Sequence, residues 1–72
     1  MNDTELPTEL SAEKAVLGAI LLDPAVFYDV SEKLTELDFY NVFNQNAYKA
    51  MCTLINSERP IDPLELEKEI NT

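Results

Sequence analysis

The hydrophobic positions of this 72-residue chain recur mainly at spacings of three and four, which is the period of an α-helix. They form four runs that are separated by short breaks rich in Asp, Asn and Pro. Residues 38–43 have the composition of a short strand, but no second β-rich run is available to pair with it, so we reject a sheet. The pattern predicts an all-α fold, a small bundle of about four helices.

The first predicted helix begins at Thr8 or Ser11, whose side-chain oxygens can cap the free amides of a first turn. Residues 12–22 are apolar almost all round, which is typical of a central helix covered on several sides. Gly18 lies within this run at a cost of about 1 kcal/mol relative to Ala. We therefore expect a neighbouring helix to approach closely at Gly18, with a hinge as the alternative.

An Asp-Pro pair is expected to end the first helix and to begin the second. The residue before a proline is pushed out of helical geometry, Asp is a favoured N-cap, and Pro suits the first helical position. We therefore predict a sharp corner at Asp23 and Pro24. The second helix is amphipathic, because its apolar residues recur at helical spacing: Phe27, Val30 and Leu34.

The helical periodicity breaks between residues 35 and 43, where Asp38 and Asn41 lie among aromatic and apolar residues. We expect a connection pinned to the core by some of its rings. Asn44 is the predicted cap of a third helix. The inward residues of that helix are predicted from their spacing to be Ala47, Tyr48, Met51, Leu54 and Ile55.

A second Asp-Pro pair predicts a fourth helix with Asp62 as its cap and with Leu66 and Ile70 facing inward. The chain stops after about two and a half turns of this helix. We therefore expect residues 8–72 to be one helical domain that is truncated at its C-terminal end. Residues 1–7, which precede the first predicted helix, are expected to be a flexible segment.

The charge argues against nucleic acid as a direct partner. Five Lys and Arg residues stand against fourteen Asp and Glu residues, which gives a net charge of −9. This charge repels phosphate backbones and withholds the attraction that supplies most non-specific nucleic-acid affinity. The acids could face a basic protein partner, but a solvated surface is the simpler interpretation.

We expect no catalytic, cofactor-binding or metal-binding residues. A phosphate-binding loop needs glycines around a Lys-Ser/Thr pair, and the chain has one glycine. With no His and a single cysteine, a Cys/His zinc site and an internal disulfide are excluded. The apolar neighbours of Cys52 indicate a small core residue and not a nucleophile.

The sequence also lacks the patterns of membrane insertion and secretion. No apolar run approaches the roughly 20 residues that a membrane-spanning helix needs. The first ten residues carry acids and no basic or apolar stretch, unlike a signal peptide. We therefore expect a cytoplasmic protein with no membrane partner.

Three motifs carry a resemblance to a known family. Residues 12–24 read AEKAVLGAILLDP, residues 38–40 read DFY, and residues 60–62 read PID. In this order and spacing they resemble the N-terminal head of DnaB-type bacterial replicative DNA helicases over residues 7–70. The structural residues, from the capping pattern and from what the resemblance implies, are Gly18 at a tight helix contact, Asp23 and Pro24 at a corner, Phe39 as an aromatic anchor and Asp62 as a helix cap.

The resemblance implies a non-catalytic protein-interaction head that contributes to the collar of a hexameric ring. Its implied partners are other helicase subunits, primase or the helicase loader. ATP and Mg belong to the motor domain of the family, so the resemblance implies no cofactor for this chain. The family's head continues into a helical hairpin, which this chain lacks. Family members commonly carry a His where this chain has Asn44. The change from His to Asn keeps a polar cap but removes a titratable group.

Two other functions fit the sequence. The chain could be a stand-alone phage- or plasmid-type mimic of the head that regulates a helicase, loader or primase by competition. It could also be an acidic DNA mimic, but its acids are spread along the chain and are not concentrated in one row. The candidate partner-binding residues are Tyr28, Tyr40 and Phe43, because aromatic residues are enriched in interface cores. The alternative for these rings is burial within the domain.

Overall fold

The computed structural model describes the backbone of residues 5–71 and the side chains of residues 11–71. The described chain contains no strand. A short 3-10 helix, η1 (Glu36–Asp38), lies between the second and third α-helices. The four α-helices confirm the predicted all-α fold: α1 (Glu5–Leu22), α2 (Val26–Ser31), α3 (Val42–Asn56) and α4 (Pro63–Ile70).

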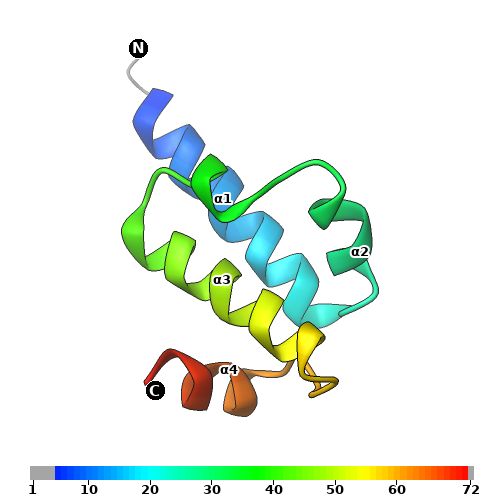
Figure 1. Cartoon of the computed structure of the whole chain (residues 1–72). Coiled ribbons are helices and arrows are strands. Elements are labelled where there is room, and N and C mark those ends of the chain that lie inside the picture. Colours follow the sequence, from blue (N-terminus) through cyan, green and yellow to red (C-terminus); the bar gives the residue numbers. More distant parts are fainter. Residues whose placement is uncertain (1–4, 72) are drawn as a thin grey trace.

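The other elements are arranged around α3. In Figure 1, α1 and η1 lie on one side of α3, α4 lies on the other, and α2 packs against α1. Tyr48, Met51 and Leu54 of α3 are buried, as their spacing predicts. Ala47 and Ile55, which were predicted to face inward, are only half-buried. The helix is therefore covered on two sides, and part of its surface remains open.

The core is centred on the ring of Tyr48. This ring stacks between Phe27 and Phe39, with centroid separations of 5.7 and 5.0 Å. Its hydroxyl donates a hydrogen bond to the carbonyl oxygen of Leu34 at 3.1 Å, which satisfies the phenol in an apolar setting. The other buried apolar side chains come from α1, α3, α4 and the turn before α4: Leu17, Ile20, Ala50, Met51, Leu54, Ile61 and Leu66.

α1 is not the centrally covered helix that its apolar sequence predicts. Leu17 and Ile20 are buried, but Leu22 is 90% exposed. α2 and α3 both pack against α1, but Leu17 and Ile20 are the only buried apolar side chains among the described residues of this helix. The prediction of cover on several sides is therefore wrong.

The N-terminal boundary also differs from the prediction. α1 begins at Glu5, so the predicted start at Thr8 or Ser11 is too late. Of the predicted flexible segment, residues 1–4 lie outside the described residues and residues 5–7 belong to α1. The division between residues 1–7 and residues 8–72 otherwise stays a prediction.

Gly18 does not lie at a tight helix contact. A Cβ atom built on it would meet no heavy atom within 4 Å beyond its immediate surroundings in α1. The neighbouring helices approach α1 on the face of Leu17 and Ile20, and the space beside Gly18 is open. The expected close approach is therefore wrong, and the packing of this chain gives no reason for the glycine.

Asp23 and Pro24 lie at a corner, but the helix starts later than predicted. The Asp23 carboxylate accepts a hydrogen bond from the amide of Ala25 at 3.2 Å, and its carbonyl oxygen accepts one from the amide of Val26 at 2.9 Å. This first turn is therefore of the tighter 3-10 type. α2 begins only at Val26 and ends before Leu34, so Pro24 is not its first residue.

The start of α4 follows its local sequence. The Asp62 carboxylate accepts a hydrogen bond from the amide of Glu65 at 2.8 Å, and Pro63 occupies the first turn. Leu66 is buried, but Ile70 is 48% exposed, so the prediction that Ile70 faces inward is wrong. α4 reaches the core with its first turns only, and its last turn lies beside an open groove.

Candidate functional site: an aromatic corner at the start of α3

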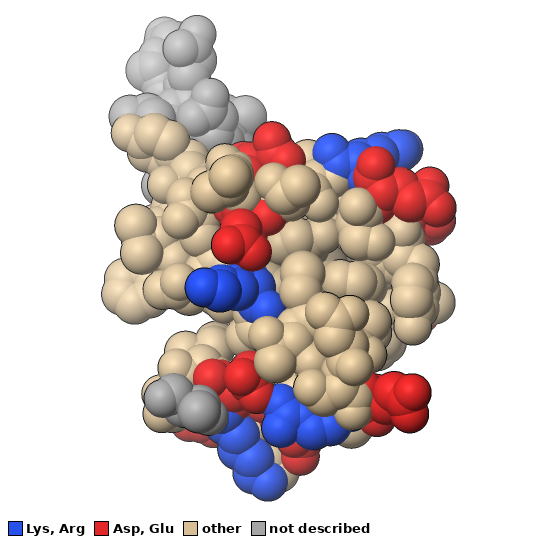
Figure 2. All heavy atoms as spheres, in the orientation of Figure 1, with Lys and Arg blue, Asp and Glu red and all other residues tan. Residues whose placement is uncertain are grey.

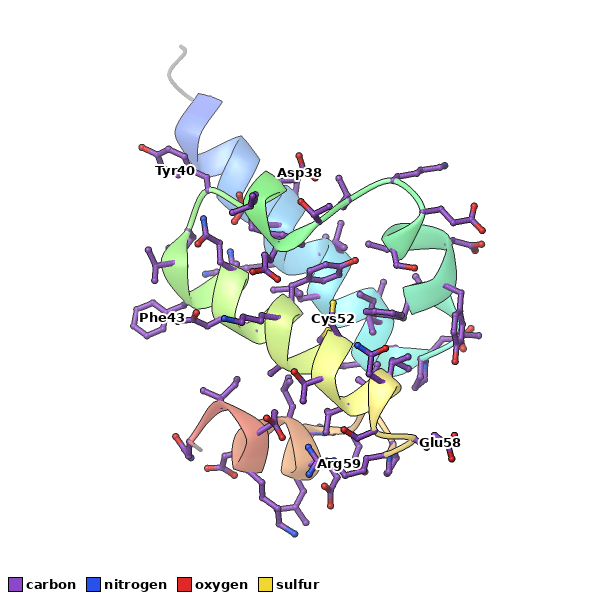
Figure 3. The ribbon with its side chains drawn as sticks, in the orientation of Figure 1. Asp38, Tyr40, Phe43, Cys52, Glu58 and Arg59 are labelled. Carbon is purple, nitrogen blue, oxygen red and sulfur yellow. The ribbon has the colours of Figure 1, made fainter. Side chains whose placement is uncertain are left out.

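Three apolar side chains project into solvent where the chain enters α3. Tyr40 is 70% exposed, Val42 is 64% exposed and Phe43 is 83% exposed. We call these three residues the aromatic corner. Figure 3 shows Tyr40 and Phe43 on the same edge of the molecule, both directed away from the body of the domain. Burial of these rings within the described chain, the alternative from the sequence, is therefore wrong.

Tyr28 is not part of the aromatic corner. It lies on α2 and is 58% exposed, and its ring contacts the edge of Phe27 at a centroid separation of 6.0 Å. Figure 1 places α2 on the opposite side of the molecule from the start of α3. The structure therefore brings together two of the three predicted partner-binding residues, Tyr40 and Phe43, and separates the third.

The backbone of the corner is held by one carboxylate from α1. Glu13 accepts hydrogen bonds from the amide of Tyr40 at 2.6 Å, the amide of Asn41 at 3.3 Å and the side-chain amide of Asn44 at 2.8 Å. We call this arrangement the Glu13 clamp. It joins the middle of α1 to the first turn of α3, and it fixes the backbone from which the exposed rings project.

The Glu13 clamp changes the acidity of its carboxyl group. The Asn44 side chain contributes most to holding the pKa of Glu13 below its ordinary value, followed by the backbone amide of Tyr40. Desolvation opposes this shift, and the amide of Asn41 adds to it. Each donor stabilises the charged form. The clamp is therefore an interaction of the ionised glutamate.

Local hydrogen bonds and packing also support the aromatic corner. Asn41 is the N-cap of α3, and its side-chain oxygen accepts a hydrogen bond from the amide of Asn44 at 3.1 Å. The predicted cap at Asn44 is therefore wrong, because that residue lies within the first turn and turns its amide toward Glu13. Gln45 donates to the carbonyl oxygen of Phe39 at 2.6 Å. Phe39 itself is buried on Tyr48, directly beneath the corner.

Glu13 is the residue that the sequence analysis missed, since it appeared there only within the motif of residues 12–24. One signal was available. Asn44 precedes Tyr48 by four positions and Met51 by seven, so a polar residue occupies the inward stripe of α3. A buried amide needs a hydrogen-bonding partner. That requirement points to a polar group on a neighbouring helix, although it does not identify which one.

The surface of α3 carries far less charge than the rest of the chain. Lys49 is the only charged residue between Asp38 and Glu58, in a protein with 26% charged residues. The exposed or half-exposed polar residues of α3 are otherwise uncharged: Gln45, Asn46, Thr53 and Asn56. In Figure 2, the edge that carries the aromatic corner is correspondingly free of acids. A surface with aromatic side chains and few charges has the composition of an interface core.

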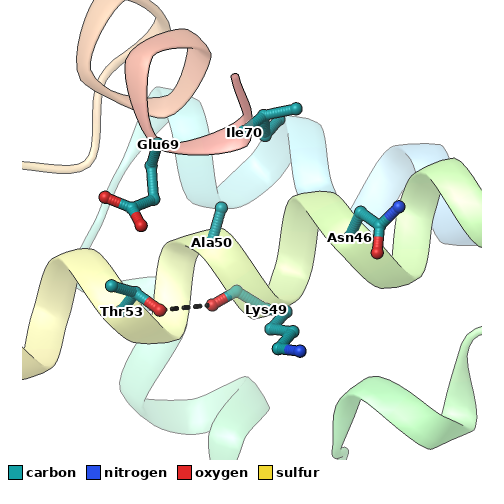
Figure 4. A pocket seen from close by; sticks show the side chains of 6 residues that line it. All are labelled: Asn46, Lys49, Ala50, Thr53, Glu69 and Ile70. Carbon is teal, nitrogen blue, oxygen red and sulfur yellow. Dashed lines mark hydrogen bonds between the residues drawn. The ribbon is translucent and has the colours of Figure 1, made fainter. Parts of the chain in front are cut away.

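A groove lies beside this surface, between α3 and α4. Its volume is about 210 Å³, and Figure 4 shows the α3 residues along one side and the end of α4 along the other. Ala50 is buried at its base, and Ile70 forms part of its wall. The remaining lining side chains are Asn46, Lys49, Thr53 and Glu69. Glu69 forms an ion pair with Arg59.

The described residues show no arrangement of catalytic groups. Among the described side chains, those of residues 11–71, no group of three or more His, Cys, Asp or Glu is placed to bind a metal ion. Burial is the main cause that raises the pKa of Cys52, which keeps its half-buried sulfur as a thiol and lowers its reactivity. Within the same part of the chain, no helix has the length and apolar character needed to cross a bilayer.

Comparisons with known proteins agree on one family. Residues 5–72 match the family model described as "DnaB-like helicase N terminal domain". Similar proteins include replicative DNA helicases of Bacillus subtilis, 39% identical over 70 residues, and of Geobacillus stearothermophilus, 38% identical over 64 residues. The matches cover 97% and 89% of this chain but only 15% and 14% of those relatives. No solved structure gives a significant match.

Proposed function

This chain belongs to the family of DnaB-like helicase N-terminal domains, and from this premise we propose that it acts as a non-catalytic protein-contact head in DNA replication. The proposed partners are other subunits of a replicative helicase, primase or a helicase loader. In this role the chain contributes to the collar of the helicase ring in the bacterial cytoplasm, and it takes no direct part in ATP hydrolysis or DNA binding.

The aromatic corner is the observation that supports a contact role. Its three apolar side chains are mostly exposed, and their backbone is held by the Glu13 clamp. Exposed aromatic residues on a rigid backbone lose little conformational freedom when a partner covers them. The net charge of −9 supports a protein partner over a nucleic acid.

The proposal is tested by binding of the purified chain to the replicative helicase and to the primase of Bacillus subtilis, one of its relatives. We expect a complex with at least one of them in isothermal titration calorimetry. Replacing Tyr40 or Phe43 with Ser removes apolar contact area, so each variant should bind at least about tenfold more weakly.

The matched control is Leu22→Ser, which removes another exposed apolar side chain from a different helix. It should leave the affinity unchanged. The proposal is wrong if neither protein binds, or if the corner variants bind as well as the parent chain. A chain that binds the helicase and slows its unwinding of DNA supports the regulatory form of this function.

A further inference from the structure

The Glu13 clamp acts on both sides of a single residue, Tyr40. Its Oε2 atom accepts a hydrogen bond from the amide of Tyr40 at 2.6 Å, and its Oε1 atom accepts one from the amide of Asn41 at 3.3 Å. These two amides belong to the planar peptide groups that flank the Cα atom of Tyr40, and their relative orientation is set by φ and ψ of that residue. One carboxylate therefore holds the backbone conformation of Tyr40 and the direction in which its ring projects.

The residues on either side of Tyr40 are anchored by contacts that do not involve Glu13. Phe39 is buried, and its carbonyl oxygen accepts a hydrogen bond from the side chain of Gln45 at 2.6 Å. Asn41 is the N-cap of α3, and its carbonyl oxygen accepts one from the amide of Gln45 at 2.9 Å. Loss of the clamp should therefore release one exposed residue between two fixed points, with the rest of the domain in place.

Phe43 is held in a different way. It is the second residue of α3, so the helix itself fixes its backbone and the direction of its side chain. The hydrogen bonds of the clamp go to Tyr40, Asn41 and Asn44. Figure 3 shows both labelled rings on the same edge of the molecule, although their backbones are fixed by different contacts.

We infer that Glu13 is a positioning residue for the Tyr40 half of the aromatic corner, which it fixes relative to Phe43 before a partner arrives. Glu13 acts through the backbone and does not itself contact the partner. The inference rests on the proposed function, because it concerns the same contact site. It adds that a residue on α1 sets the affinity contributed by one of the two rings and leaves the other unchanged.

The size of the effect follows from the freedom that Tyr40 regains. Glu13→Ala removes both acceptor oxygens and leaves a residue that favours helix. The partner must then immobilise Tyr40 itself, so we expect binding to weaken about three- to tenfold. The loss should not exceed that of Tyr40→Ser, because a misplaced ring can lose at most what the ring contributes.

A double-mutant cycle by isothermal titration calorimetry tests the inference, with the Bacillus subtilis helicase or primase as the partner. Glu13→Ala should cause no further loss of affinity in a Tyr40→Ser background. In a Phe43→Ser background it should cause the same fold-loss as in the parent chain. A general structural role of Glu13 would weaken binding by the same factor in both backgrounds.

The matched control is Asp62→Ala, which also removes a carboxylate that accepts a hydrogen bond from a backbone amide, but at the start of α4. It should leave the affinity unchanged. Circular dichroism verifies that each variant is folded. If Glu13→Ala does not fold, Glu13→Gln takes its place in the cycle with a smaller expected loss, since it keeps one acceptor oxygen.

Backbone relaxation of ¹⁵N-labelled protein tests the positioning role without any partner. In the parent chain, the order parameters at positions 40, 41 and 43 should all be about 0.85, the value of a rigid backbone. In Glu13→Ala, those at 40 and 41 should fall toward about 0.6, whereas the value at 43 should stay unchanged. Unchanged values at all three positions overturn the inference, and so does an equal fall at all three.

Equal losses of affinity in the Tyr40→Ser and Phe43→Ser backgrounds also overturn the inference, as does an unchanged affinity of Glu13→Ala. If the parent chain binds neither protein, the proposed function is wrong. The relaxation measurements then still decide whether Glu13 positions Tyr40, so the two failures are distinguishable.

Discussion

The two ends of α3 are held by different kinds of contact. At its C-terminal end, the amides of Glu58 and Arg59 donate to the carbonyl oxygens of Ile55 and Leu54 at 3.0 and 2.9 Å, which is a Schellman motif within a few residues of sequence. At its N-terminal end, the hydrogen bonds of the Glu13 clamp join residues that are 27 to 31 positions apart.

This difference separates local stability from tertiary stability. The C-terminal end can form as soon as α3 forms, because all of its partners are neighbours in the chain. The N-terminal end takes its final position only when α1 has packed against α3. The aromatic corner therefore depends on the tertiary fold for its shape, and damage to the clamp should have larger effects than damage to the local caps.

The largest effect is expected from Asn44→Asp. The substitution replaces the amide that donates to Glu13 with a second carboxylate, so two negative charges meet at a buried position. We expect the lowest urea midpoint of all the variants considered, with partial recovery in acid, where a carboxyl group is protonated. Asn46→Asp is the control, since it adds the same charge at an exposed position of the same helix. Equal midpoints for the two variants would contradict the clamp.

Glu13→Gln should have the next largest effect, and it should depend on pH. The pKa of Glu13 is lowered in the folded chain, so its stabilising contribution is present above the unfolded-state pKa and is lost as the pH falls through the folded-state pKa. The variant should therefore be less stable than the parent at neutral pH and should approach it in acid. Urea unfolding at a series of pH values measures the difference in unfolding free energy between the variant and the parent, with Glu32→Gln as an exposed control.

The difference in unfolding free energy between Glu13→Gln and the parent should shrink in acid. If this difference stays constant down to strongly acidic pH, the ionised carboxylate is not the stabilising form. Glu32 is exposed at the end of α2, and its replacement should give no comparable pH dependence.

Asp62→Ala should cost about 1 kcal/mol of unfolding free energy, because it removes the side chain that caps α4. This effect concerns a local contact and should be smaller than that of Asn44→Asp. Urea unfolding provides the measurement, and Glu67→Ala on the exposed side of α4 provides the control. A loss larger than that of Asn44→Asp would reverse the proposed ranking of the two kinds of contact.

The smallest effect is expected from Glu58→Gly, and it should be stabilising. Glu58 has a φ of 60°, the left-handed conformation that ends the Schellman motif and that glycine adopts more easily. The greater freedom of glycine in the unfolded chain offsets part of this gain, which leaves about 0.5 kcal/mol. The urea midpoint should rise slightly, while Ser57→Gly, at a position without a positive φ, should not raise it.

The comparison also explains which predictions from sequence succeeded. The cap at Asp62 and the buried stripe of Tyr48, Met51 and Leu54 depend on neighbours one or two turns away, and their spacing revealed them. The cap at Asn44 was assigned wrongly, because the residue's partner lies on another helix. The prediction of a close helix approach at Gly18 was wrong for the same reason, since the surroundings of Gly18 depend on where the other helices pack.

The candidate site also has features that the sequence could predict and features that it could not. Tyr40 and Phe43 could be named from sequence because aromatic residues are enriched in interface cores, and the same argument named Tyr28, which lies on the other side of the molecule. The hydrogen bonds by which Glu13 holds the backbone of the aromatic corner could not be predicted from the sequence. A carboxylate in an apolar helix has many possible donors, and sequence spacing does not select among groups on distant elements.

The sequence by itself determined the helical class, the approximate helix positions and the family, because periodicity, caps and short motifs are properties of neighbouring residues. Only the tertiary structure decided that α3 and not α1 is the best-covered helix, that one glutamate positions the aromatic corner, and that a groove lies beside it. The physical reason is that burial and hydrogen bonding between helices depend on which faces meet, and α1 has apolar side chains on nearly every face.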